Sequence, residues 1–245
     1  LSFETAAHRM GARVISISDV KSTSHAKGES LLDSARMVGS YADLVVWRHP
    51  RDGATRLISQ AVDVPVVNAG DGRLGHPTQT LVDLYTLYRE WGSLEGKTVG
   101  IMGDLRNGRT CRSLLWGLSL AGARVVLFPA TGLDWEAGFE TRVLERSGLR
   151  SREVWHSLFK EWTGSESARL IEPKGLLQGS LFRDHTPRLD HLDALYLTRL
   201  QVERGGKASS GGYPGIRIPQ LRDALLESCL ILHPLPRLAE VPVEL

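Results

Sequence analysis

The chain has 245 residues, 42% of them hydrophobic, which is enough for one large α/β domain or two smaller ones with real cores. Thirty basic and 28 acidic residues give a formal net charge of only +2, which argues against nucleic acid or an anionic membrane as a partner. The two cysteines exclude a disulfide framework and a cysteine-rich zinc site. No apolar run approaches the roughly 20 residues that cross a bilayer. We therefore expect a cytoplasmic protein, or an organellar one if a transit peptide has been removed.

Short runs rich in valine and isoleucine alternate along the chain with stretches of helical periodicity. This alternation is typical of strands and crossover helices around a parallel sheet. The predicted strands are residues 13–18, 44–48, 64–68, 98–102, 124–128, 194–198 and 229–232. We expect an α/β fold of two domains, each with a mainly parallel sheet flanked by helices.

Two helices are predicted between these strands, at residues 30–41 and 78–91. The second has an apolar stripe at positions i, i+3, i+4 and i+7, which predicts that this stripe is buried. The stripe consists of Leu81, Leu84, Tyr85 and Tyr88. Pro77 suits the first turn of this helix, where a missing N–H costs nothing.

The segment WGSLEGK (91–97) has two glycines and precedes a new strand, so we place a domain boundary there, between domains 1–91 and 92–245. Residues 131–189 are less regular, and REVWHSLFKEW within them predicts an amphipathic helix inside an enlarged connection. The run GGKASSGGYPG (205–215) predicts a flexible loop.

Six short polar clusters follow predicted strands or open predicted helices, where open α/β sheets bind ligands. They are STSHAKGES, RHP, GHPTQ, GDLRNGRT, TRLQVER and HPLPR. Each alone is typical of a solvated strand end, but several carry arginine, whose guanidinium pairs with carboxylate and phosphate. Together they predict a pocket for an anion with more than one negative group. No dinucleotide-binding glycine pattern and no histidine spacing typical of a metal site is present.

Seven blocks of the sequence, in order, resemble the aspartate and ornithine carbamoyltransferases. The blocks are SFETAAHRMGA, KGESLLDS, VVWRHP, NAGDG followed by HPTQTLVDLY, VGIMGDLRNGRT, LYLTRLQVER and LHPLPR. The resemblance covers most of the chain apart from residues 131–189. The aspartate branch is favoured because HPLP stands where ornithine enzymes carry HCLP, and because TRLQVER looks like the aspartate-binding strand end.

The resemblance implies a carbamoyltransferase-like fold in which residues 1–91 bind carbamoyl phosphate and residues 92–245 bind L-aspartate. The implied reaction is attack of the aspartate amine on the carbamoyl carbon, which releases phosphate and yields N-carbamoyl-L-aspartate for pyrimidine biosynthesis. No metal or organic cofactor is implied. The implied assembly is a homotrimer with active sites between subunits.

The matching motifs also imply which residues form the site. Catalytic roles are implied for Arg48, His76 and Lys27, with His76 near the carbonyl oxygen of the carbamoyl group and Lys27 supplied by a neighbouring subunit. The implied substrate-binding residues are Gln79, Arg109, Arg199, Gln201, Leu235 and Ser24. Among these, Gln79 would hold the carbamoyl amide, Leu235 would offer its backbone carbonyl, and Thr23 is an alternative to Ser24.

The printed sequence departs from the family at both ends. Family members carry S-T-R-T-R immediately before the position of Leu1, where backbone N–H groups and arginine grip the phosphate, and they continue into a C-terminal helix. We therefore expect the chain as written to be impaired, and residues 131–189 look expanded. Two alternatives stay open: a non-catalytic structural subunit bound to other proteins, and a ligand sensor without turnover.

Overall fold

The computed structural model describes residues 1–17, 28–130, 132–139, 192–207, 229–238 and 240–241. The chain divides into two compact units, 1–72 and 73–245. The observed division therefore lies before the helix at 77–91, not after it as predicted, because that helix packs with the second unit. The amphipathic helix predicted within residues 131–189, and most of the predicted loop 205–215, lie outside the described residues.

The first unit is built around two parallel strands. Its elements are α1 (Ser2–Arg9), α2 (Leu31–Ser40), β1 (Val45–His49), α3 (Ala54–Ser59) and β2 (Val66–Asp71). Val45 of β1 lies opposite Val66 of β2, and α3 packs against both strands. Helix α2 begins after Ser30, whose hydroxyl accepts a hydrogen bond from the Asp33 N–H at 3.1 Å, as an N-cap residue does.

The prediction of a strand at residues 13–18 is wrong for the part that the structure describes. Residues 13–17 form no strand, and Ile15 and Ile17 are 78% and 57% exposed. Alternating β-branched residues favour an extended backbone, but a strand also needs a partner and a surface that covers its apolar face. Among the described residues this segment has neither.

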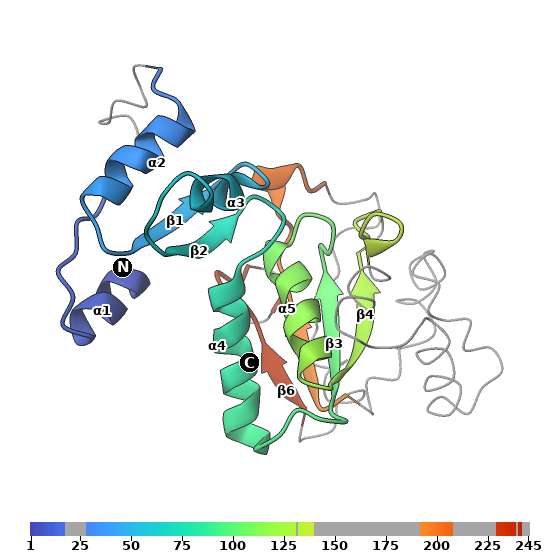
Figure 1. The fold of residues 1–245 in the computed structure, drawn as a ribbon. Helices are drawn as coiled ribbons and strands as arrows, with labels where there is room; N and C mark the ends of the chain where they lie inside the picture. The colour runs from blue at the N-terminus through green and yellow to red at the C-terminus, as the bar shows by residue number, and fades with distance from the viewer. Residues whose placement is uncertain (18–27, 131, 140–191, 208–228, 239, 242–245) are drawn as a thin grey trace. The chain divides into compact units, whose positions relative to one another are not determined.

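The second unit holds a four-stranded parallel sheet with strand order β4-β3-β5-β6 (Figure 1). Its elements are α4 (Pro77–Trp91), β3 (Thr98–Gly103), α5 (Arg109–Leu120), β4 (Arg124–Pro129), β5 (Ala194–Leu197), the 3-10 turn η4 (Val202–Arg204) and β6 (Leu230–Leu232). From β3 the chain goes first to β4 on one side and later to β5 on the other. The strand order therefore reverses between β3 and β5, the position where open α/β sheets bind ligands.

The parallel α/β fold predicted from the sequence is confirmed. The six other predicted strands are observed with no limit shifted by more than three residues, and the predicted helices 30–41 and 78–91 are α2 and α4. Pro77 is the first residue of α4, as expected. No helix in the described ranges is long and apolar enough to cross a membrane.

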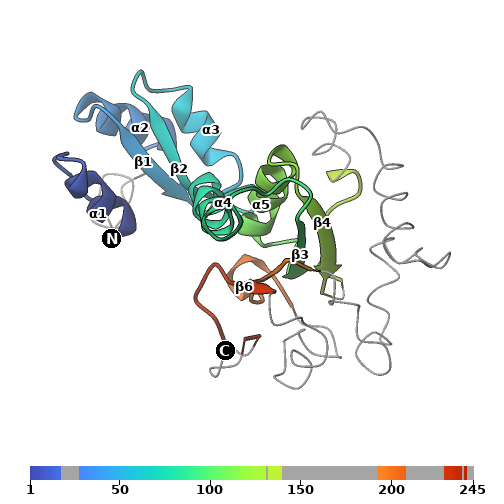
Figure 2. The same ribbon diagram turned by 90° about the horizontal axis from the view of Figure 1, so that it is seen from below.

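Helices α4 and α5 run side by side on one face of the second sheet (Figure 2). Gly117 of α5 makes this close approach possible, because a Cβ atom there would lie 2.5 Å from a Thr80 methyl carbon and 2.8 Å from Leu84. The core beneath α5 includes Ile101 of β3 and Leu118 of α5, both fully buried.

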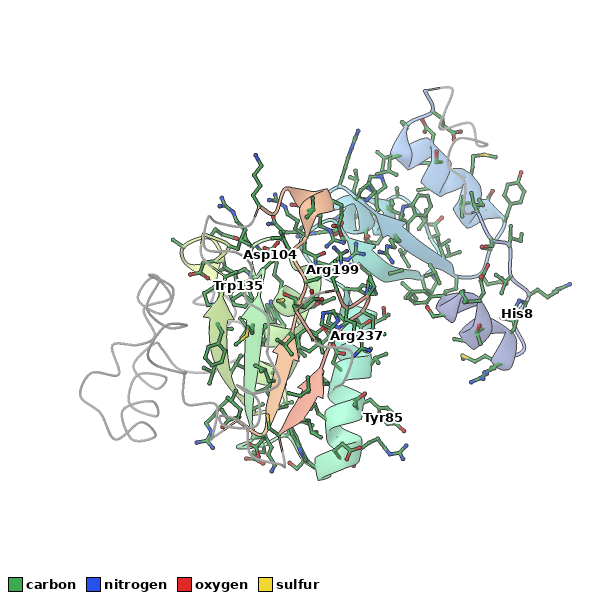
Figure 3. All side chains as sticks on the ribbon, turned by 180° about the vertical axis from the view of Figure 1, so that it is seen from behind. His8, Tyr85, Asp104, Trp135, Arg199 and Arg237 are labelled. Carbon is green, nitrogen blue, oxygen red and sulfur yellow. The ribbon has the colours of Figure 1, made fainter. Side chains whose placement is uncertain are left out.

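The prediction of the buried stripe of α4 is wrong in most of its members. Leu81, Tyr85 and Tyr88 are 65%, 60% and 54% exposed, and only Leu84 packs partly against the core. Figure 3 shows the Tyr85 side chain pointing away from the sheet. The buried residues of α4 are instead Thr80, Asp83 and Leu87. They too have helical spacing, but two of them are polar and so do not contribute to an apolar pattern.

Candidate functional site

The loops that follow β3 and β5 meet at the point where the strand order of the second sheet reverses. Asp104 follows β3 and Arg199 lies two residues beyond the end of β5, and both lie at the carboxyl edge of the sheet (Figure 3). Because the fold brings the two loops to one place, polar residues that are far apart in the sequence become neighbours here.

Asp104 ties the two loops together. Its side chain is fully buried, and Oδ1 accepts hydrogen bonds from the Asn107 backbone N–H at 3.0 Å and from the Asn107 side chain at 3.1 Å. Its other oxygen, Oδ2, accepts from the Gln201 backbone N–H at 3.1 Å. Gly206 passes so close that a Cβ there would lie 2.6 Å from Oδ2. Asp104 therefore fixes the backbone on which Gln201 is carried.

The predicted anion-binding residues of the second unit lie around these loops. Arg109 is the first residue of α5 and is only 6% exposed. Arg199 makes two hydrogen bonds to the Glu203 carboxylate, at 2.6 and 3.0 Å. This pairing lowers the pKa of Glu203 to about 2. The Gln201 side chain donates to the Arg199 carbonyl at 3.0 Å and accepts a hydrogen bond from Arg204.

A cavity of about 360 Å³ opens beside these residues in the second unit. It is lined by Arg73, Arg106, Asn107, Gly132, Leu133, Arg204, Gly205 and Lys207. Four of these side chains are cationic and none is acidic, so the cavity favours anions. The sequence placed Arg106 and Arg204 within polar clusters, but it did not single out Arg73 or Lys207, which lie in loops without a recognisable pattern.

His76 caps the amino end of α4. Its ring atom Nδ1 accepts the Gln79 backbone N–H at 3.4 Å and lies 3.2 Å from the Thr78 hydroxyl. A neutral imidazole that accepts at Nδ1 carries its proton on Nε2. The cap therefore favours the tautomer in which His76 presents an N–H donor from Nε2.

Ser113 of α5 joins His76 to the region of Arg109. The Ser113 hydroxyl accepts a hydrogen bond from the His76 backbone N–H at 3.0 Å and donates to the Arg109 carbonyl at 3.0 Å. One hydroxyl thus fixes the start of α4 against the first turn of α5. The sequence analysis missed Ser113, because a contact across 37 positions has no local signal.

Gln79 lies in the first turn of α4, and its side chain is bound by Asp83, one turn further along the same helix. Its side-chain Nε2 donates to Asp83 Oδ1 at 3.0 Å. Burial is the main influence on Asp83 and raises its pKa to about 6.

The loop after β6 carries Leu235, the residue predicted to offer its carbonyl. Leu235 has φ of 52°, in the left-handed region that costs a non-glycine residue about 1 kcal/mol or more, and its side chain is 69% exposed. Its N–H donates to His233 Nδ1 at 2.9 Å. The other ring nitrogen of His233 lies 3.0 Å from the buried carboxylate of Glu240. The hydrogen bond from the Leu235 N–H to His233 thus stabilises the left-handed backbone of Leu235.

The remaining predicted residues belong elsewhere. Arg48 lies near the carboxyl end of β1 in the first unit, where it is exposed. Lys27, Ser24 and Thr23 lie outside the described residues. The structure therefore brings together His76, Arg109, Arg199 and Gln201 as parts of one unit, whereas Arg48 belongs to the other.

Comparison with known proteins agrees with this arrangement. The family model for the Aspartate/ornithine carbamoyltransferase, carbamoyl-P binding domain matches residues 1–89. The aspartate carbamoyltransferase catalytic subunit of Thermoplasma acidophilum is 39% identical over 249 aligned positions, which cover 100% of this chain and 71% of the relative.

Solved structures show the same likeness. A Trypanosoma cruzi aspartate transcarbamoylase in complex with aspartate and phosphate matches with a TM-score of 0.71 and 31% identity, over 98% of this chain and 68% of the other. The same enzyme in complex with carbamoyl phosphate matches with a TM-score of 0.74 and 28% identity, over 99% and 70%. The sequence blocks, the parallel sheets and these matches agree, and the chain belongs to the aspartate carbamoyltransferase family.

Proposed function

We propose that the chain transfers the carbamoyl group of carbamoyl phosphate to the amine of L-aspartate, the reaction that supplies N-carbamoyl-L-aspartate for pyrimidine biosynthesis. The observation that carries the proposal is the Ser113 hydroxyl, which bonds both the His76 N–H and the Arg109 carbonyl. His76 is suited to bind a carbonyl oxygen, and Arg109 is suited to bind a carboxylate. The Ser113 hydroxyl therefore holds these two residues on neighbouring helix turns. A transfer between a carbamoyl group and an amino acid needs this combination.

The roles of His76 and Gln79 follow from the hydrogen-bonding groups of a carbamoyl unit. The carbonyl oxygen of the carbamoyl group needs hydrogen bonds that become stronger as negative charge develops on it. In the tautomer favoured by the α4 cap, the Nε2–H of His76 can donate such a bond. The carbamoyl NH₂ group needs an acceptor, and the Gln79 side-chain oxygen is one. As the aspartate nitrogen bonds to the carbamoyl carbon, the C–O bond to phosphate breaks, and the departing phosphate takes up the amine proton.

The aspartate carboxylates are assigned to Arg109, Arg199 and Gln201. Arg199 already holds a carboxylate in two-point fashion, that of Glu203, so its guanidinium is oriented for this kind of partner. The cationic cavity beside it adds a positive field that favours a dianion over a neutral amino acid.

The other parts of the proposed site come from the first unit, from the loop after β6, and from residues outside the described ranges. Arg48 would contact carbamoyl phosphate, and the Leu235 carbonyl would accept from its amide or from the aspartate amine. Lys27 and Ser24 would be supplied by a neighbouring subunit of a homotrimer. Under this proposal trimerisation is a condition of activity.

The version that carries S-T-R-T-R before Leu1, here the extended chain, would add phosphate contacts. Two charge-assisted hydrogen bonds of about 1.5 to 3 kcal/mol each would raise carbamoyl phosphate affinity at least about a hundredfold.

The direct test replaces Arg109 in the extended chain. For Arg109→Ala we expect the aspartate KM to rise by about tenfold or more, because a charge-assisted carboxylate contact is lost, while the carbamoyl phosphate KM changes by less than about threefold. The measurement is steady-state formation of carbamoyl-aspartate with each substrate varied in turn. The matched control is Arg89→Ala, which replaces an exposed arginine in the last turn of α4 and should leave both values unchanged.

Two outcomes would count against the proposal. Equal changes in both KM values would mean that Arg109 is not on the aspartate side of the site. Binding of both ligands without any product would favour the sensor or the non-catalytic subunit.

A further inference from the structure

Asp83 is a buried carboxylate that faces the interior of the second unit from α4. Its side chain is only 6% exposed, and it lies one helical turn after Gln79, whose Nε2 donates to Asp83 Oδ1 at 3.0 Å. The Asp83 carboxyl also faces the Tyr196 hydroxyl of β5, and its second oxygen, Oδ2, has no other partner among the described residues. Burying a carboxylate costs stability, and in the described residues only the Gln79 amide and the Tyr196 hydroxyl offset that cost, so its presence here calls for an explanation.

The surroundings of Asp83 come from three elements. Tyr196 of β5 is 1% exposed, and its hydroxyl interacts electrostatically with the Asp83 carboxyl. From α5, Thr110 and the buried thiol of Cys111 face the same hydroxyl. Tyr196 and Cys111 are the ionisable neighbours, and burial raises the pKa of both groups, so they are neutral at physiological pH. The partners of the Asp83 carboxylate are therefore the neutral Tyr196 hydroxyl and the Gln79 amide, and of these only Gln79 belongs to the proposed substrate-binding residues.

An ionised carboxylate can only accept hydrogen bonds, whereas an amide has a donor end and an acceptor end. When the carboxylate of Asp83 binds the NH₂ end of Gln79, the amide oxygen is the atom left to contact a ligand. Without the carboxylate the amide can rotate by half a turn and present its NH₂ group instead. An NH₂ group would repel the NH₂ of a carbamoyl group.

We propose that Asp83 is a positioning residue that fixes Gln79 with its oxygen towards the carbamoyl NH₂ group. The inference rests on the proposed function and adds to it the device that sets the polarity of Gln79. It also gives a reason for a carboxylate on the buried face of α4.

A dependence on pH follows from the same geometry. Burial raises the pKa of Asp83 to about 6, so the carboxylate is ionised above that pH and protonated below it. A protonated Asp83 can donate to the Gln79 oxygen and stabilise the inverted amide. We therefore expect carbamoyl phosphate binding to weaken as the pH falls through about 6.

The test is a double-mutant cycle in the extended chain with Asp83→Asn, Gln79→Ala and both together. Asparagine has the shape of aspartate but does not fix the direction of the Gln79 amide. We expect Asp83→Asn to lower kcat/KM for carbamoyl phosphate about tenfold, the size of one misdirected hydrogen bond. With Gln79→Ala already present, it should add almost nothing. Glu90→Gln, an exposed carboxylate-to-amide change on the same helix, is the control and should have no effect.

A second readout does not depend on activity. The side-chain amide resonance of Gln79, assigned by its absence in Gln79→Ala, should shift with a midpoint near pH 6 and should stop titrating in Asp83→Asn. If the amide titrates but no carbamoyl-aspartate forms in the parent protein, the proposed function fails while the coupling of Asp83 to Gln79 stands. The inference would be overturned if the Gln79 amide resonance did not titrate. It would also be overturned if Asp83→Asn lowered kcat/KM equally in the parent and in Gln79→Ala.

Discussion

The imidazole ring of His76 caps α4, and this structural role bears on the chemical role proposed for it. Nδ1 caps α4 by accepting the Gln79 N–H, and this leaves the proton on Nε2, the atom assigned to the carbamoyl oxygen. The cap is therefore part of the chemistry, because it selects the tautomer. A histidine at this position of the sequence was recognisable, but its tautomer required the geometry of the helix start.

Asp83 gives a prediction about stability at the same scale. A carboxyl pKa that is raised from 3.8 to about 6 by folding means that the folded protein binds the proton more tightly than the unfolded chain. The stabilising effect of that proton is present below about pH 4 and is lost as the pH rises through about 6. Its full size is about 3 kcal/mol for this mostly buried group.

Replacement by asparagine removes this titration. We expect Asp83→Asn to gain stability relative to the parent as the pH rises from about 4 to 8, by up to about 3 kcal/mol, although it loses activity. The measurement is urea unfolding of both proteins across that pH range. A difference in unfolding free energy that stays constant with pH would show that Asp83 is not the titrating group.

At the scale of the elements, α4 shows how an apolar pattern can mislead. Leu81, Tyr85 and Tyr88 have helical spacing and still face outward, whereas Thr80 and Asp83 are buried. Gly117 decides the orientation, because the absence of its side chain lets the polar face of α4 approach α5. The spacing of apolar residues therefore predicts that a helix forms. It predicts which face of the helix is buried only when that face is apolar.

Two leucines on α4 provide a matched test of this orientation. Leu87 is 1% exposed and Leu81 is 65% exposed. We expect Leu87→Ala to lower the unfolding free energy by about 2 to 5 kcal/mol, because it leaves a cavity in the core. Leu81→Ala should change it by no more than about 0.5 kcal/mol, as is usual for surface positions. Denaturant unfolding of the two variants tests which face of α4 is buried. Equal losses of unfolding free energy would contradict the observed packing.

The other elements differ in how far the sequence could predict them. Strand β3 was found with only its last residue missing, because a fully buried parallel strand reads as a continuous apolar run. Residues 13–17 have a similar composition but no described partner, and a partner is not encoded locally. Arg109 and Gln201 were identified through the family resemblance. Ser113 and Asp104 were not assigned roles, since their contacts join distant segments.

At the scale of the whole molecule, the chain consists of two α/β units that divide between Gly72 and Arg73. The second unit carries most of the described site, including the groups assigned to aspartate and to the carbamoyl carbonyl and amide. Arg48 belongs to the first unit.

The central claim is that the chain carbamoylates aspartate, and following the labelled carbon tests it most directly. Carbamoyl phosphate labelled with ¹³C at its carbonyl would be mixed with the extended chain and either L-aspartate or L-ornithine, and the carbon followed by NMR. We predict that the label moves to N-carbamoyl-L-aspartate and that none is transferred to ornithine. Failure of the extended chain to move the label to aspartate, or equal transfer to ornithine, would contradict the account.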